Sequence, residues 1–156
     1  MKFEMQNLRK RIDEWVGRLL IIILGIMVIN VLWQVFTRFF TDSPSSFTDE
    51  LARYLMIWLG ILGAAYVAGR NEHVAIDVLV QKAPKKISAL MKKITTLSVF
   101  CFALFGMVIG GGRLVYVTFK LGQYSPALQI PLAFVYAIIP ISGILIVFYK
   151  LTQPKL

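Results

Sequence analysis

Four long apolar segments, separated by shorter polar connections, dominate the pattern of hydrophobic and polar positions along the chain. Each segment approaches or exceeds the ~18–20 residues that a helix needs to cross a hydrocarbon layer of about 30 Å. We therefore expect an all-α integral membrane protein with four transmembrane helices, at about residues 17–39, 50–69, 94–119 and 131–149. The spans and their connections use nearly all 156 residues, so 1–156 is expected to form a single membrane domain.

Two segments beside these spans mix apolar and charged residues at helical spacing. In residues 1–18, apolar side chains recur among basic ones, and we expect this segment to lie at the membrane surface before the chain turns inward. After the second span, one helical face would carry Arg70, His73, Asp77 and Gln81, which predicts a second interfacial helix. The basic start also resembles a signal peptide, but its apolar run is too long and no small-residue cleavage site follows.

The second span carries a charged cluster at each end and none between them. Asp49 and Glu50 stand in its first turn, where the positive end of the helix dipole favours acidic residues. Arg53 follows them by four and three residues, so it can pair with either carboxylate on the same helical face. Ser46 or Thr48 can cap the start of this helix.

Small residues also recur along the second span. Gly60, Ala64 and Ala68 repeat every four residues, and Gly63 broadens the surface that they form. Such stripes let helices approach closely in lipid, where the burial of apolar surface provides no driving force. We interpret this stripe as a helix-packing surface, for a partner either in this chain or in another protein.

Single residues in the other spans predict further contacts. Asn30 and Gln34 lie four residues apart in the first span, and both are expected to form hydrogen bonds to another helix. Gly106 and Gly110, extended by Gly111 and Gly112, favour close packing of the third span, and Pro140 should kink the fourth.

The net charge of +9 is mainly a signal of topology. Basic residues gather in the first segment and in the connection between the second and third spans, whereas the other connections hold few. By the positive-inside rule, both termini and residues 70–93 are cytoplasmic, an N-in/C-in arrangement. Membrane lipids with anionic headgroups suffice as partners for this charge, and nucleic-acid binding is not needed.

The sequence holds no set of residues suited to catalysis or to a cofactor. Its single histidine, His73, has acidic neighbours, but the ligand count falls short of the usual three or four for a metal. Every acidic residue lies outside the hydrocarbon or at its edge, whereas a coupled transporter normally places one inside the membrane. We therefore expect no enzyme and no cofactor in this chain, but a helical scaffold within a larger membrane complex.

Two sequence segments resemble the small membrane subunit, the Q or small-permease component (DctQ-like), of tripartite ATP-independent periplasmic (TRAP) transporters. The first starts at Asp49-Glu50-Leu51-Ala52-Arg53 and extends to Arg70-Asn71-Glu72-His73-Val74-Ala75-Ile76-Asp77. The second is Ser125-Pro126-Ala127-Leu128-Gln129-Ile130-Pro131, with Tyr136 and Pro140. The candidate partner-interface residues are Asp49, Glu50, Arg53, Trp58, Gly60, Gly63, Ala64, Arg70, Glu72, His73, Asp77, Ser125, Pro126 and Pro131.

This resemblance implies a non-catalytic scaffold subunit that supports the symport of a small organic acid across the bacterial inner membrane. A large TRAP membrane subunit would hold the substrate and the coupling ion, usually sodium, and a periplasmic substrate-binding protein would deliver the substrate. The small subunit would pack against the stationary part of the large one. The loop around Ser125 and Pro126 and residues 42–50 are candidates for touching the binding protein.

An alternative from another class is a small self-assembling four-helix transporter or channel. Several copies would have to line a path with Asn30, Gln34 and Arg113. Such a protein would transport without any other gene product.

Overall fold

The computed structural model describes residues 2–40, 45–70 and 85–152, and all of its named elements in these ranges are helices. The first two spans are α1 (Lys2–Phe40) and α2 (Ser46–Arg70). The third consists of α4 (Lys85–Cys101), the π-helical η1 (Phe102–Gly110) and α5 (Gly111–Lys120), and the fourth of α6 (Leu132–Tyr136) and α7 (Ile138–Thr152). Within these ranges, four helices are long and apolar enough to cross a membrane, which confirms the predicted fold class.

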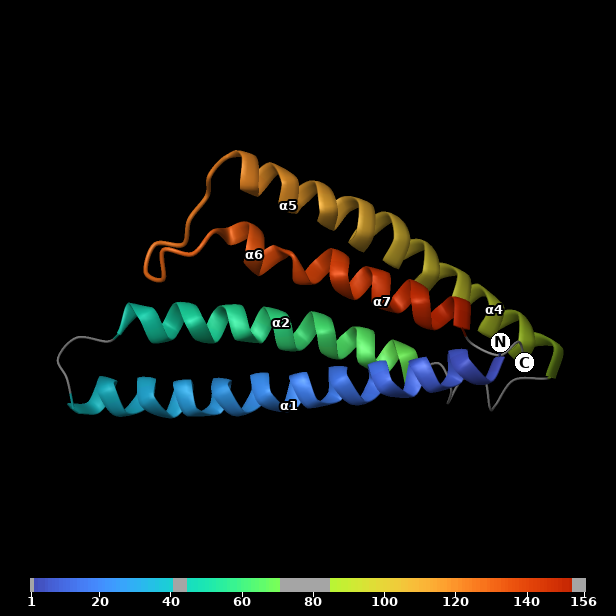
Figure 1. Cartoon of the computed structure of the whole chain (residues 1–156), viewed down its shortest axis with the longest axis horizontal. Coiled ribbons are helices and arrows are strands. Elements are labelled where there is room, and N and C mark those ends of the chain that lie inside the picture. The colour runs from blue at the N-terminus through green and yellow to red at the C-terminus, as the bar shows by residue number, and fades with distance from the viewer. Residues whose placement is uncertain (1, 41–44, 71–84, 153–156) are drawn as a thin grey trace.

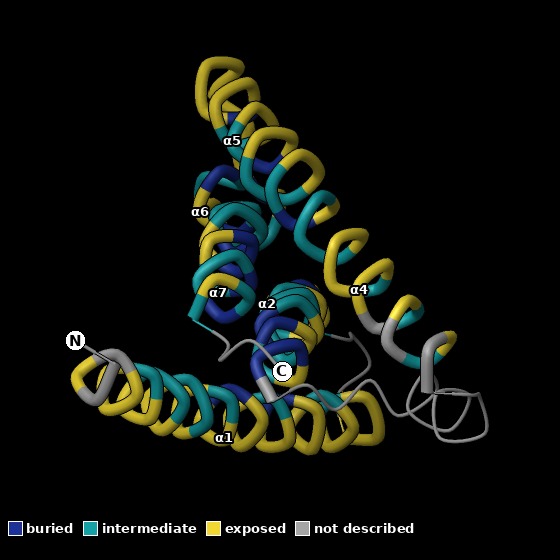
Figure 2. The backbone as a smooth tube through the Cα atoms, turned by 90° about the vertical axis from the view of Figure 1, so that its right-hand side faces the viewer, coloured by how far each residue is buried: buried dark blue, intermediate teal, exposed yellow. Residues whose placement is uncertain are grey.

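The helices form an open array around α2 (Figure 1). Helix α2 packs against α1 along most of its length and against α7, and α7 in turn packs against η1. Between the described parts of α1 and the third span there is no comparable contact. Buried backbone is concentrated on α2, α6 and α7, whereas α1, α4 and α5 are largely exposed (Figure 2). The outer helices therefore present apolar side chains to lipid or to a partner.

The two ends of the array differ. We call the end that holds residues 45–50 and the connection 121–131 the loop end, and the end that holds Lys2 and Thr152 the terminal end (Figure 1). The start of α1 and the end of α7 thus lie on the same side, as an even number of spans requires.

Helix α1 does not turn after residue 18, contrary to our expectation, but runs unbroken for 39 residues or about 58 Å. No proline interrupts it. Nine of its half-buried and buried positions alternate steps of four and three residues, the spacing of a coiled-coil seam, and the half-buried Ile12 and Gly17 flank them. The apolar positions Leu8, Trp15 and Leu19, which were expected to lie at the membrane surface, are exposed and lie outside this seam. The nine positions are Arg9, Asp13, Val16, Leu20, Ile23, Met27, Asn30, Gln34 and Thr37.

Exposed aromatic side chains mark two levels along α1. Trp15 is 72% exposed near the terminal end, and Trp33 is 58% exposed toward the loop end, where its ring stacks on that of Phe36. Tryptophan side chains gather at membrane–water interfaces. Trp15 and Trp33 are about 27 Å apart along the helix, which is close to a hydrocarbon layer of about 30 Å.

The third and fourth spans meet through Gly143 and through one of the predicted glycines, Gly111. A Cβ at Gly143 would lie 2.7 Å from the Cβ of Met107, and one at Gly111 would lie 2.7 Å from Ile139 Cγ2. A Cβ at Gly106 or Gly110 would meet only atoms of the same span, so of the predicted cluster Gly111 makes the close contact within the chain. The π-helical turns of η1 change the angular spacing of its residues, which a sequence reading at ordinary α-helical spacing misses.

Pro140 interrupts the fourth span as predicted. The break falls at Ala137, between α6 and α7. Proline has no N–H to donate to the carbonyl four residues earlier, which is that of Tyr136, so the helix is weakened immediately before Ala137.

Candidate partner-binding site at the loop end

Glu50 joins α2 to the connection between the third and fourth spans. Its Oε2 accepts hydrogen bonds from the backbone N–H groups of Ala127 at 2.8 Å and Leu128 at 2.9 Å. Its Oε1 accepts one from the hydroxyl of Tyr54 at 2.6 Å. The residue is only 7% exposed, so these bonds replace the water that a carboxylate would otherwise require.

The connection itself is closed by its own backbone. Ser125 N–H donates to Ile130 O at 2.9 Å, and Gln129 N–H donates to Ser125 O at 3.1 Å. Gln129 adopts a positive φ of 55°, a left-handed conformation that is uncommon outside glycine. This turn directs the N–H groups of Ala127 and Leu128 to Glu50, which satisfies them in the way that an acidic side chain caps a helix start.

Asp49, the neighbour of Glu50, faces outward. It accepts hydrogen bonds from Arg53 Nη2 at 3.1 Å and from Gln34 Nε2 of α1 at 3.3 Å. Of the two pairs that the sequence allowed for Arg53, the structure therefore has the one with Asp49. The two adjacent carboxylates thus differ: Asp49 forms its bonds at the surface, whereas Glu50 forms its bonds inside the protein.

Polar side chains of α1 complete the contact at this end. Asn30, which is buried, donates from Nδ2 to the carbonyl of Thr48 at 2.8 Å. Together with the bond of Gln34 to Asp49, it confirms the predicted interhelical bonding of both residues. Thr48, a predicted cap, instead donates its hydroxyl to Ser45 O at 2.9 Å, and the same carbonyl accepts the first backbone bond of α2 from Asp49 N–H.

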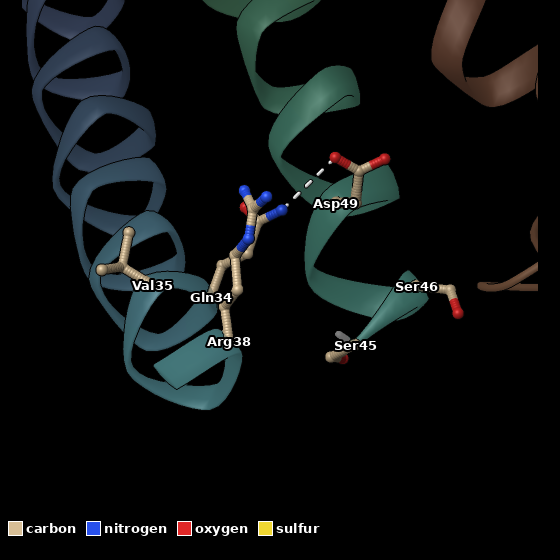
Figure 3. Close-up of a pocket in the computed structure, with 6 residues that line it drawn as sticks. All are labelled: Gln34, Val35, Arg38, Ser45, Ser46 and Asp49. Atoms are coloured by element: carbon tan, nitrogen blue, oxygen red, sulfur yellow. Dashed lines mark hydrogen bonds between the residues drawn. The ribbon is translucent and has the colours of Figure 1, made fainter. Parts of the chain in front are cut away.

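Two adjoining cavities open at the loop end. One has a volume of about 590 Å³, and the other about 340 Å³. Figure 3 shows Gln34 and Arg38 of α1 facing Asp49 of α2 across the first cavity. Ser46 and Asp49 line both cavities, so we treat them together as the loop-end groove. The other lining residues are Val35, Ser45, Glu50, Arg53, Pro126 and Ala127.

The loop-end groove carries side chains of both charges, which suits the recognition of a water-exposed surface. Its cationic side chains, Arg38 and Arg53, are exposed. Within the described ranges, no group of three or more His, Cys, Asp or Glu side chains could hold a metal ion.

The small-residue stripe of α2 is partly open. Gly60 and Ala64 are exposed, and a Cβ at Gly60 or Gly63 would meet nothing within 4 Å. Ala68, by contrast, is buried inside the chain at 6% exposure. Residues four apart are displaced by about 40° around a helix, so the stripe turns from the outer surface to the inner one along α2.

Other predicted interface residues serve contacts within the chain. Trp58 donates from Nε1 to the carbonyl of Val135 at 3.1 Å, which ties α2 to α6. Ser125 is fully buried beside Glu50 and Tyr54, although its hydroxyl lacks hydrogen-bond geometry to either. Pro131 precedes α6 and forms an isolated antiparallel β-bridge with Tyr124. Of this group, Pro126 alone is exposed.

A second cluster holds the terminal end together. The guanidinium of Arg9 donates to the carbonyl of Gly69 and lies 5.7 Å from the ring centroid of Tyr149. Tyr149 is fully buried, with Asp13 beside its hydroxyl. Arg9 therefore joins α1 to the carbonyl end of α2, where the helix dipole favours a cation. Of the predicted residues at this end, Arg70 ends α2, whereas Glu72, His73 and Asp77 lie outside the described residues.

Several of these contacts escaped the sequence analysis. Tyr54 stands four residues after Glu50, a spacing that could have indicated their hydrogen bond. The bonds from Glu50 to Ala127 and Leu128 span 77 and 78 residues, and no local spacing predicts them. Arg9 and Tyr149 likewise lie at opposite ends of the sequence.

Comparison with known proteins gives consistent matches. Residues 27–153 match the family of tripartite ATP-independent periplasmic transporters, DctQ component. One relative, from Haemophilus influenzae, is named provisionally as a TRAP transporter small permease. It is 32% identical to this chain, and the match covers 96% of this chain and 91% of the length of the relative. A second relative is the C4-dicarboxylate TRAP transporter small permease protein DctQ of Rhodobacter capsulatus. It is 33% identical, and the match covers 64% of this chain and 44% of the length of that protein.

One further relative is much longer. The sialic acid TRAP transporter permease protein SiaT of Haemophilus influenzae is 35% identical over 97 residues, which are 61% of this chain and 15% of that protein. That permease therefore contains a segment similar to this chain within a polypeptide several times its length.

Proposed function

Because the chain belongs to the DctQ-component family of TRAP transporters, we propose that it is the scaffold subunit on which a larger permease is assembled. It is a multi-pass membrane protein of the bacterial inner membrane and a component of a TRAP transporter. The proposed role is non-catalytic: the chain supports the large membrane subunit while that subunit moves substrate.

The observation that carries this proposal is the contrast between the two faces of α2. Its inner face is tied to α1 by hydrogen bonds near both ends, through Asn30 and Arg9, and to α6 by the hydrogen bond of Trp58. It also packs against α7. Its outer face presents Gly60 and Ala64 to open space. A rigid helix with a smooth outer face suits close packing against another transmembrane helix.

The long relative supports a large permease as the partner. In SiaT, a segment similar to this chain is covalently part of a much longer permease. We propose that this chain makes the corresponding association without a covalent link, and that Gly60, Gly63 and Ala64 lie in the contact.

Substrate and coupling ion are assigned to the large permease in this proposal. Among the described residues, the acids all lie before Trp15 in α1 or in the first turns of α2, and none lies in the middle of an apolar span, where an ion-coupling carboxylate is expected. The names of two relatives refer to sialic acid and to C4-dicarboxylates, which supports a small organic acid as the substrate. Sodium is the proposed coupling ion.

The loop end is proposed to face the periplasm and to contact a substrate-binding protein. Basic residues are concentrated in residues 1–18 and 70–93, and the positive-inside rule then places both termini in the cytoplasm. The loop-end groove would meet the delivered binding protein, while anionic lipids would contact the basic segments.

The test is reconstitution into liposomes. Liposomes are prepared with each of three proteins alone and with all three together: this chain, its large permease and the binding protein. The sodium-driven uptake of labelled sialic acid or of a C4-dicarboxylate is then measured. We expect uptake only when all three proteins are present. Uptake by this chain alone would overturn the scaffold role.

The alternative, a self-assembling channel, would require several copies of the chain. Asn30 and Gln34 are bonded to α2, and α1 makes no contact with α5, which carries Arg113. The three residues that would line a path are therefore not brought together within one chain.

A further inference from the structure

We infer that Glu50 is a positioning residue, which holds the loop of residues 121–131 in the shape that forms one wall of the loop-end groove. This inference rests on the proposed function, because it assigns the loop to the docking of the binding protein. It separates the task of Glu50 from that of Asp49, although both stand in the same turn of α2.

The first argument concerns exposure. Glu50 is 7% exposed, so its carboxylate is covered by the chain and is not available to bind a partner. Its oxygens accept three hydrogen bonds, from Ala127, Leu128 and Tyr54. A change at Glu50 must therefore reach a docked protein through the loop.

The second argument concerns the loop. Its own backbone bonds close a turn from Ser125 to Ile130, but they leave the N–H groups of Ala127 and Leu128 to Glu50. Unsatisfied backbone N–H groups carry a high energetic cost where water is excluded. Glu50 thus determines whether this turn stays against α2 or moves to find other partners.

The third argument concerns the groove. Ala127 and Pro126 line the smaller cavity opposite Ser46 and Arg53. The cavity exists only while the loop stays beside the first turns of α2. A water-soluble partner that binds in this groove therefore contacts the start of α2 and the loop, two segments 77 residues apart, as one continuous surface.

The inference is tested by amide hydrogen exchange on the chain in nanodiscs with its large permease. In Glu50→Ala, we expect exchange at residues 127 and 128 to accelerate by at least about tenfold, the effect of losing hydrogen bonds to a charged group. Glu50→Gln keeps an acceptor oxygen and should restore most of the protection. Asp49→Ala is the matched control, because Asp49 accepts its hydrogen bonds from Gln34 and Arg53 and not from the loop, and it should leave these amides unchanged.

Docking is measured on the same nanodiscs by titration with the labelled binding protein. The dissociation constant should rise several-fold in Glu50→Ala and return toward that of the unmodified chain in Glu50→Gln. If Glu50→Ala does not fold, Glu50→Asp replaces it, since the shorter side chain withdraws the carboxylate from the loop without changing the charge.

Unchanged exchange at residues 127 and 128 in the Ala or Asp variant would overturn the inference. So would accelerated exchange across all helices, because this would indicate general destabilisation. Faster exchange at the loop with unaltered docking would overturn the role of the loop in docking. Failure of the scaffold proposal is recognised separately, on the unmodified chain, by uptake without the large permease.

Discussion

Gly69 of α2 lies directly against the phenol ring of Tyr149 in α7. A Cβ at Gly69 would stand 2.7 Å from the ring carbons Cδ2 and Cε2, which is closer than real Cβ contacts. The ring also lies under the Arg9 guanidinium, so it has little freedom to move away.

Gly69→Ala should therefore destabilise the chain, by about 1–3 kcal/mol, because the added methyl group overpacks this contact. Gly25→Ala is the control, since a Cβ there meets nothing within 4 Å. The thermal unfolding of both variants in detergent gives the comparison. Equal stability of the two would show that the contact relaxes without cost.

The outer stripe of α2 gives a prediction about assembly. Gly60→Leu combined with Ala64→Leu should lower the yield of co-purified large permease by about tenfold or more, because side chains then separate the helices. The fold of the isolated chain should not change, since these positions are open. The matched control is Gly25→Leu combined with Gly112→Leu, two glycines that are also unobstructed. An unchanged yield from the α2 variant would assign this stripe to lipid.

Asn30 and Gln34 should contribute unequally to the contact of α1 with α2. Asn30→Leu removes a buried hydrogen bond of 2.8 Å and should cost about 0.5–1 kcal/mol of unfolding free energy, the usual range between membrane helices. Gln34→Leu removes a more exposed bond of 3.3 Å and should cost less. Unfolding in mixed micelles measures both. A larger loss for Gln34 would reverse the assigned order.

The pair of Asp49 and Arg53 should matter little for stability. Their side chains are 59% and 69% exposed, and exposed pairs at this helical spacing contribute about 0.3–0.5 kcal/mol. Asp49→Asn should therefore change the unfolding free energy by less than about 0.5 kcal/mol, with a smaller effect at high salt. A loss above about 1 kcal/mol would indicate that Asp49 has a structural role beyond this pair.

The membrane helices were predictable because apolar length is a local property of the sequence. Hydropathy located four spans, and Pro140 located the break in the last one. In the first half of α1, the sequence predicted a helix but not the face that packs on other helices. The apolar positions Leu8, Trp15 and Leu19 are exposed, whereas Arg9, Asp13 and Val16 are half-buried. The face that packs depends on where the other helices lie, which is not a local property of the sequence.

The site was harder to predict, because its decisive contacts are not local. The helical spacing of Arg53 allowed a bond to Asp49 or Glu50, and only Asp49 makes it. Glu50 instead meets backbone N–H groups about half the chain away, whose directions depend on the turn around Gln129. No pattern of side chains in the sequence encodes such donors. The segments that resemble the TRAP small permease nevertheless meet in space at this bond.

The two aromatic levels of α1 determine how the chain responds to bilayer thickness. Trp15 and Trp33 are spaced for a layer of about 30 Å, and a thicker or thinner membrane produces a hydrophobic mismatch that a helix usually relieves by tilting. Here α1 is bound to α2 near both ends, through Arg9 and Asn30, so it cannot tilt independently. A change in lipid chain length would therefore rotate α1 and α2 as one body, and with them the loop-end groove.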